Sequence, residues 1–382
     1  MMFNQKALFC IVTGLFWFSL YAYVPQISSF AEDMGASYKM IGMITGAYGL
    51  SQTILRIPLG IVSDVLNKRK IFVVSGLFTA IFSALIVFMF PNTYILLTGR
   101  FLAGVAAATW VNFTVMFSGY YKPSESTKAI GIINSANMLG QFAAVLLGGI
   151  LSLYLGVKYI FLLSTIVGLM GFFLSFFIQK EEDTVDRKPF KVSDLFIILK
   201  NIDILHICFL GILSQLITFA TIFGFTPIVA SNLGANNFEL GLLTTLFNLP
   251  QILFSALAGI VFVKCLGSKN TLLIGFGLST VLCIFTPFVP NLYLLYLIQI
   301  ISGIGKAMTF PMLMGLVIKN VEPGLRTTTM GFYQAIYGIG MIMGPILLGV
   351  IGDKFGLMAG FIITGLLGIL AIISISVVGI KD

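Results

Sequence analysis

The sequence predicts an all-α membrane protein with twelve transmembrane helices arranged in two six-helix, pseudo-symmetric halves. Its 382 residues are 58% hydrophobic and only 9% charged, which lies outside the composition of soluble domains. Apolar runs of about 20 residues, long enough to cross a bilayer as helices, recur along the chain. These runs lack the alternating pattern of a β-barrel. The second half also repeats the glycine pattern of the first.

The first apolar run follows a short basic start, as a signal peptide does. It has no small-residue cleavage site and is long enough to span a bilayer, so we count it as the first helix. The first six expected spans are residues 7–30, 40–63, 71–90, 94–119, 129–153 and 158–178. The second six are residues 204–231, 238–263, 271–290, 292–318, 328–351 and 357–379. We therefore expect an N-terminal half over 1–178, a cytoplasmic linker over 179–203 and a C-terminal half over 204–382.

The two halves are related by a nearly constant shift in residue number. A shift of 199 places "PNTYILL" (91–97) on "PNLYLLY" (290–296). A shift of 200 places Gly131, Gly140, Gly149 and Gly156 on Gly331, Gly340, Gly349 and Gly356. This pattern indicates duplication of a six-helix unit, and the copies are parallel because each crosses the membrane an even number of times.

The basic residues predict the orientation. Placing both termini in the cytoplasm leaves only Lys39, Lys158 and Lys354 outside. The net charge of +8 then reflects the positive-inside rule, not a nucleic-acid partner. The four cysteines are far apart and lie in or beside apolar runs, so we expect no disulfide, metal site or cofactor. Compact loops favour a bacterial inner membrane, and we expect a monomer.

A charged stretch follows the second span. The sequence "GIVSDVLNKRKIF" (60–72) resembles the loop motif of the major facilitator superfamily, with Val65 where arginine is usual and Asn67 where glycine is usual. Asparagine tolerates a left-handed turn, so we expect the turn to survive. The resemblance implies alternating access of the two halves to a small solute, with a breakable cytoplasmic latch. The latch residues would be Gly60, Asp64, Lys68 and Arg69.

Two further motifs are similar to those of the drug:proton antiporter branch of that superfamily. "LTGRFLAGVAAATW" (97–110) resembles its helix 4 motif. "GQFAAVLLGG" (140–149) resembles its helix 5 motif, with Ala144 and Val145 at the usual glycine and proline positions, and a better copy lies in the eleventh span. The helix-packing residues would be Gly140, Gly148, Gly149, Gly340, Gly344, Pro345 and Gly349. This resemblance implies proton-coupled efflux.

Ionisable residues inside a membrane are costly and are therefore functional candidates. Arg56, Arg100 and Lys306 lie within spans, whereas no Asp or Glu lies deep in any span. We expect Arg100, with Asp33 at the outer end of the first span, to couple protons, and Arg56 and Lys306 to contact substrate. Polar residues expected on the helices that line the cavity in this superfamily are Asn112, Gln141, Gln215, Asn248, Gln251, Tyr333 and Tyr337. Any of them could instead hydrogen-bond between helices.

A cavity with fixed positive charge favours anionic, zwitterionic or neutral solutes. The first expectation is a proton-coupled exporter. The alternative is uptake or exchange of a small organic or inorganic anion, because Arg56 and Lys306 come from opposite halves and could together clamp a negative group. An enzyme is disfavoured because His206 is the only histidine and no acid pair is visible. Lipid translocation stays open.

Overall fold

The computed structural model describes residues 4–66, 68–121, 126–179, 198–257, 262–319, 321–322 and 325–380, which are almost wholly helical. The helices before the linker are α1 (Gln5–Tyr21), α2 (Ile27–Asp33), α3 (Tyr38–Leu66), α4 (Arg69–Met89), α5 (Thr93–Ala108), α6 (Trp110–Ser118), α7 (Ser126–Leu155) and α8 (Lys158–Ser175). Those after it are α10 (Ile202–Ala220), η2 (Thr221–Phe225), α11 (Thr226–Asn232), α12 (Asn237–Leu257), α13 (Val263–Phe285), η4 (Thr286–Phe288), α14 (Leu292–Lys319), α15 (Arg326–Phe355) and α16 (Leu357–Val378).

The described helices confirm the all-α membrane class. Over these residues, nine helical stretches are long and apolar enough to cross a membrane. A further apolar helix, α1, has 17 residues. The count of twelve spans stays a prediction.

Three spans expected to be continuous are interrupted. The span 7–30 divides into α1 and α2, joined by a turn that contains Pro25. The span 94–119 divides into α5 and α6 at Thr109. The span 204–231 passes through the π-helical turn η2 into α11, where Pro227 supplies no backbone N–H. Apolarity does not predict these interruptions, because it depends on the side chains, whereas the interruptions are changes in backbone hydrogen bonding.

Several helix ends carry their own sequence signals. The side chain of Asn92 accepts hydrogen bonds from the N–H groups of Tyr94 and Ile95 at the start of α5. Asn201 accepts from Asp203 and Ile204 in the same way at the start of α10. Such caps satisfy backbone donors that have no partner inside the helix.

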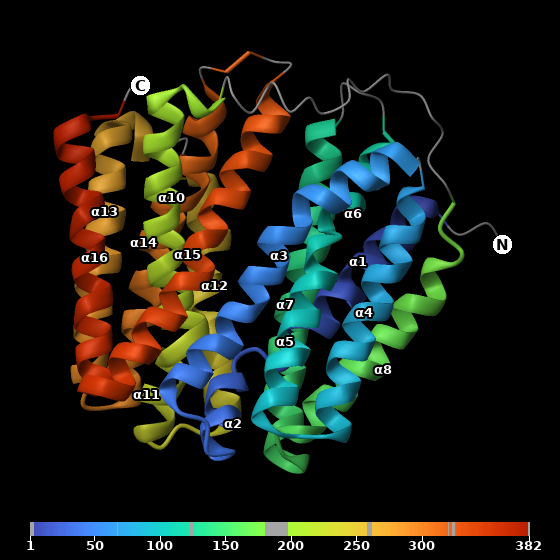
Figure 1. Cartoon of the computed structure of the whole chain (residues 1–382), viewed down its shortest axis with the longest axis horizontal. Coiled ribbons are helices and arrows are strands. Elements are labelled where there is room, and N and C mark those ends of the chain that lie inside the picture. The colour runs from blue at the N-terminus through green and yellow to red at the C-terminus, as the bar shows by residue number, and fades with distance from the viewer. Residues whose placement is uncertain are drawn as a thin grey trace. The chain divides into compact units, whose positions relative to one another are not determined.

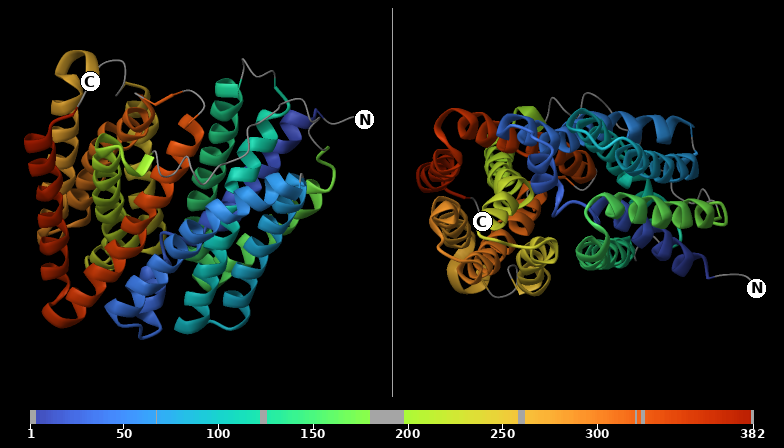
Figure 2. Two further views of the ribbon diagram at one scale, coloured as in Figure 1. Left: turned by 45° about the horizontal axis from the view of Figure 1, so that its top comes forward. Right: turned by 90° about the horizontal axis from the view of Figure 1, so that it is seen from below.

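The chain forms two compact units. Unit 1 comprises Met1–Ile27, Ser51–Pro189 and Asn237–Gly241, and unit 2 comprises Ser28–Leu50, Phe190–Asn236 and Leu242–Asp382. Inside unit 1, α1 packs on α7 and α8, and α4 packs on α5 and α8; inside unit 2, α10 packs on α15, and α13 packs on α14 and α16 (Figures 1 and 2). Most of these helix pairs correspond under the sequence repeat. The expected boundaries at 178 and 204 stay a prediction.

Glycines allow the central helix pair of each unit to touch through the backbone. In unit 1, a methyl group at Gly140 of α7 would overlap the Gly14 carbonyl of α1, and one at Gly148 would overlap the Ala22 carbonyl. In unit 2, a methyl group at Gly340 of α15 would overlap the Ile212 carbonyl of α10, and one at Gly344 would overlap the Leu216 carbonyl. Pro345 lies within α15. Close approach of this kind is typical of helix pairs in membranes.

Candidate functional site

Lys306 is the centre of the candidate site in unit 2. It lies midway along α14, and only 6% of the residue is exposed. Its ammonium group donates to Gln215 Oε1 at 2.8 Å and to Ser214 Oγ at 3.0 Å, both on α10. The ring centroid of Phe310, one helical turn along α14, lies 4.8 Å from Lys306 Nζ. Contacts between α10 and α14 therefore hold the ammonium in place.

The partners of this ammonium in the described part of the chain are neutral. Among the described residues they are Ser214, Gln215 and the Phe310 ring, with a longer contact of 3.4 Å to the Ser214 carbonyl. Burying an ammonium group is costly unless an opposite charge accompanies it. The protonated site is therefore electrostatically suited to a ligand that carries negative charge.

An aromatic row extends from Lys306 towards α15. The Phe310 ring lies 5.7 Å from the Tyr337 ring, and Tyr337 lies 5.2 Å from Tyr333 in a T-shaped pair. Tyr333 is 0% exposed, and its hydroxyl has no hydrogen-bond partner in the described part of the chain. The structure thus brings together four of the residues expected at the site. They are Gln215, Lys306, Tyr333 and Tyr337.

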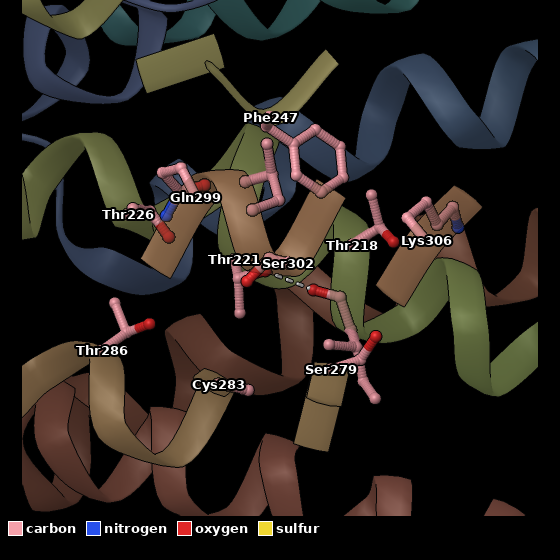
Figure 3. A pocket seen from close by; sticks show the side chains of 12 residues that line it. Thr218, Thr221, Thr226, Phe247, Ser279, Cys283, Thr286, Gln299, Ser302 and Lys306 are labelled. Atoms are coloured by element: carbon pink, nitrogen blue, oxygen red, sulfur yellow. Dashed lines mark hydrogen bonds between the residues drawn. The ribbon is translucent and has the colours of Figure 1, made fainter. Parts of the chain in front are cut away.

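A small polar cavity adjoins the Lys306 side chain (Figure 3). The space open to the centre of a water molecule is about 20 Å³, enough for about one water. In Figure 3, Lys306 lies beside Thr218 at the right of the view, and Thr226 and Thr286 lie at the left. Thr226 is 1% exposed, and its hydroxyl lacks a hydrogen-bond partner within the described residues. The cavity can therefore accept a further polar group.

Arg56, Arg100 and Asn112 belong to unit 1. Arg100 of α5 is 3% exposed and Asn112 of α6 is 1% exposed. Neither amide atom of Asn112 has a hydrogen-bond partner in the part of the chain that is described. Arg56 lies half-buried on α3. Arg56 and Lys306 belong to different units, so their joint clamp stays a prediction.

The acids that could exchange protons lie at the end of α2. Asp33 is exposed there, and Glu32 is half-buried. Burial, and then the neighbouring charge of Asp33, raise the pKa of the Glu32 carboxyl. Glu32 is therefore protonated over a wider pH range than an ordinary glutamate.

Three other expected polar residues bond within their own helices. Gln141 donates to Asn137 Oδ1 at 2.6 Å on α7. Gln251 donates to the Phe247 carbonyl at 3.1 Å and to Asn248 Oδ1 at 3.3 Å on α12. Their roles in binding stay predictions.

Of the expected cytoplasmic latch, only part can be located. Gly60 and the backbone of Asp64 lie in α3, whereas the Asp64 side chain falls outside the described residues. Lys68 is exposed, and Arg69 begins α4. The latch contacts therefore stay a prediction.

Ser214, Phe310 and the cavity hydroxyls were not predicted from the sequence, because Ser, Thr and Phe are ordinary residues of membrane helices. A usable signal was present nonetheless. Phe310 follows Lys306 by four residues, which places both on one face of a helix.

The family model of the Major Facilitator Superfamily matches residues 9–228 and 207–381. An uncharacterised MFS-type transporter of Methanocaldococcus jannaschii is 27% identical over 87% of this chain and 87% of its own. The multidrug resistance protein MdtG of Proteus mirabilis is 25% identical over 93% of this chain and 90% of its own. Among solved structures, a mutant of the nucleoside transporter NupG has a TM-score of 0.83 at 15% identity, covering 98% of this chain and 99% of its own. The chain belongs to the Major Facilitator Superfamily, and it is a membrane transporter of small molecules, not an enzyme.

Proposed function

We propose that the protein exports a small organic solute by alternating access, in exchange for protons, and that Lys306 binds a polar or negatively charged group of that solute. The buried Lys306 ammonium with only neutral partners among the described residues is the observation that carries this proposal. The similarity to MdtG, which is named a multidrug resistance protein, supports efflux. We further propose a cell-membrane location with both termini in the cytoplasm and a monomeric protein.

The charge of the site selects the class of solute. A cationic solute would lose its hydration beside a buried ammonium and would gain no compensating charge there. An anionic solute gains a charge-assisted hydrogen bond, which is roughly twice as strong as a neutral one. A neutral or zwitterionic solute can accept from the ammonium with an oxygen atom. We therefore propose anionic, zwitterionic or neutral solutes.

The same ammonium also supports a second candidate, uptake or exchange of a small anion. In this case the anion's own gradient drives transport, and protons do not move in the opposite direction. The two candidates thus differ in one observable, the response of a pH gradient to added solute.

Everted membrane vesicles that contain the protein test the proposal. The vesicles are energised, and anionic, neutral and cationic compounds are added in turn while the pH gradient is monitored. Export with proton exchange predicts that anionic or neutral compounds dissipate the gradient, and that Lys306→Gln abolishes the response. Lys319→Gln is the matched control, because it removes a charge from an exposed position of the same helix. No response to any compound, together with gradient-independent anion exchange in proteoliposomes, would favour the second candidate.

A further inference from the structure

The start of α3 is capped by a side chain more than 300 residues away in sequence. The backbone N–H of Tyr38 donates to Asp353 Oδ1 at 2.8 Å, and that of Lys39 donates to Asp353 Oδ2 at 2.9 Å. Asp353 lies in the last turn of α15. Its carboxylate satisfies two backbone donors that have no partner within α3, and it lies at the positive end of the helix dipole. We call this contact the Asp353 cap.

The capped segment lies tightly against α15 beyond the cap. A methyl group at Gly349 of α15 would overlap the Tyr38 carbonyl, and one at Gly42 of α3 would overlap the Pro345 carbonyl. Also in unit 2, Ser29 of α2 shares a 2.9 Å hydrogen bond with Ser231 of α11. Residues Ser28–Leu50 consequently belong to unit 2, although they precede the linker.

The sequence repeat supplies an internal comparison for this contact. In unit 1, the start of α12 packs against α7 at the positions related to Gly42 and Gly349. A methyl group at Gly241 would lie 3.2 Å from the Val145 carbonyl, and one at Gly149 would lie 3.4 Å from Phe238 Cα. The shift of 200 that relates Gly149 to Gly349 places Leu153 at the position of Asp353.

The two related contacts differ in closeness as well as in charge. At Gly42 and Gly349 an added methyl group would overlap a backbone oxygen, whereas at Gly241 and Gly149 it would lie 3.2 and 3.4 Å from the nearest atom. The tighter contact is the one that carries the Asp353 cap, and the looser contact has Leu153 at the related position. By the predicted topology, the capped end of α3 lies outside the cell.

We propose that the Asp353 cap is an outer latch, which holds the first turns of α3 on α15 and must break before the transporter opens outward. This inference rests on the alternating access of the proposed function, but not on the identity of the solute. The cap biases the conformational equilibrium towards the state in which residues 38–50 lie on α15.

An engineered cysteine in place of Thr45 can report release of this segment. Thr45 lies three residues after Gly42 and four before Gly49, so it shares the helix face that meets α15. The residue is 1% exposed, and its hydroxyl has no hydrogen-bond partner among the described residues. Thr45→Cys therefore removes no observed hydrogen bond, and we expect the buried thiol to react faster when the segment leaves α15.

The experiment measures labelling of the Thr45→Cys protein by a membrane-impermeant maleimide in proteoliposomes, with the four native cysteines replaced. Asp353→Leu introduces the residue of the related repeat. We expect it to raise the labelling rate about fivefold, the factor that corresponds to loss of one helix cap. Asp353→Asn should have a smaller effect, because one acceptor oxygen remains. Lys354→Gln is the control at the neighbouring exposed position and should not change the rate.

Equal labelling rates in the parent, Asp353→Leu and Asp353→Asn proteins would overturn the latch, and so would absence of labelling in all of them. Monodispersity and helical content of each variant exclude a folding defect as the cause of faster labelling. The assay uses no solute, so a failure to find transport activity in vesicles leaves its result intact. Conversely, a transporter that responds to solutes but shows no effect at Asp353 would refute the latch alone.

Discussion

Gln215→Leu should destabilise the protein by leaving the Lys306 ammonium without its shortest hydrogen bond. In the structure, Gln215 Oε1 accepts from Lys306 Nζ at 2.8 Å, at a site where the lysine is 6% exposed. A hydrogen bond to a charged group contributes about 1.5–3 kcal/mol. Leucine has a similar volume, so the change removes the acceptor without opening a cavity. We expect a loss of about 2 kcal/mol in unfolding free energy.

A double-mutant cycle compares the cost of Gln215→Leu in the presence and in the absence of the Lys306 ammonium. In a Lys306→Met background no ammonium needs an acceptor, so Gln215→Leu should cost much less there. Thermal unfolding in detergent can be followed by a thiol-reactive dye, because Cys208 and Cys283 are buried in unit 2 and become reactive on unfolding. Exposed Cys265 is replaced to remove background labelling. Equal costs of Gln215→Leu in both backgrounds would refute the assigned interaction.

Three further predictions concern other parts of the chain. Gly340→Ala should destabilise by about 1–3 kcal/mol in thermal unfolding, because its methyl group would overlap the Ile212 carbonyl, whereas Gly331→Ala on the same helix has open space and should be nearly neutral. Asn112→Leu should not destabilise, because the buried amide forms no hydrogen bond among the described residues, but solute-driven proton movement should weaken; destabilisation would contradict this view. The raised pKa of Glu32 means that the folded chain binds the carboxyl proton of Glu32 more tightly than the unfolded chain does. The stability contributed by protonated Glu32 is therefore lost as pH rises through the folded pKa. Glu32→Gln should remove this contribution from the pH dependence of the unfolding free energy.

Much of the helical architecture was predictable, because apolar length and glycine spacing are local properties of the sequence. The shift of 200 residues predicted that Gly140 and Gly340 have related roles, and both glycines bring two helix backbones together. The helix interruptions were not predictable from apolarity. Pro25 and Pro227 were available as signals, but a proline inside a membrane helix can also be tolerated without a break.

The candidate site was only partly predictable. A lysine in the middle of an apolar run is costly to bury and is therefore a functional candidate, so Lys306 could be predicted from the sequence. Its partners Ser214 and Phe310 are common residues whose importance comes from tertiary contacts. Asp353 was also missed, because an acid at a helix end usually lies in solvent. Comparison with Leu153 in the other repeat would have identified it as unusual.

The central claim, that Lys306 binds the transported solute, is tested most directly by equilibrium binding. The first compound that dissipates the pH gradient in vesicles is titrated into purified parent, Lys306→Gln and Lys319→Gln proteins. Loss of a charged hydrogen bond predicts an affinity at least about tenfold weaker for Lys306→Gln, with Lys319→Gln unchanged. Equal affinities of the parent and Lys306→Gln proteins would contradict the account.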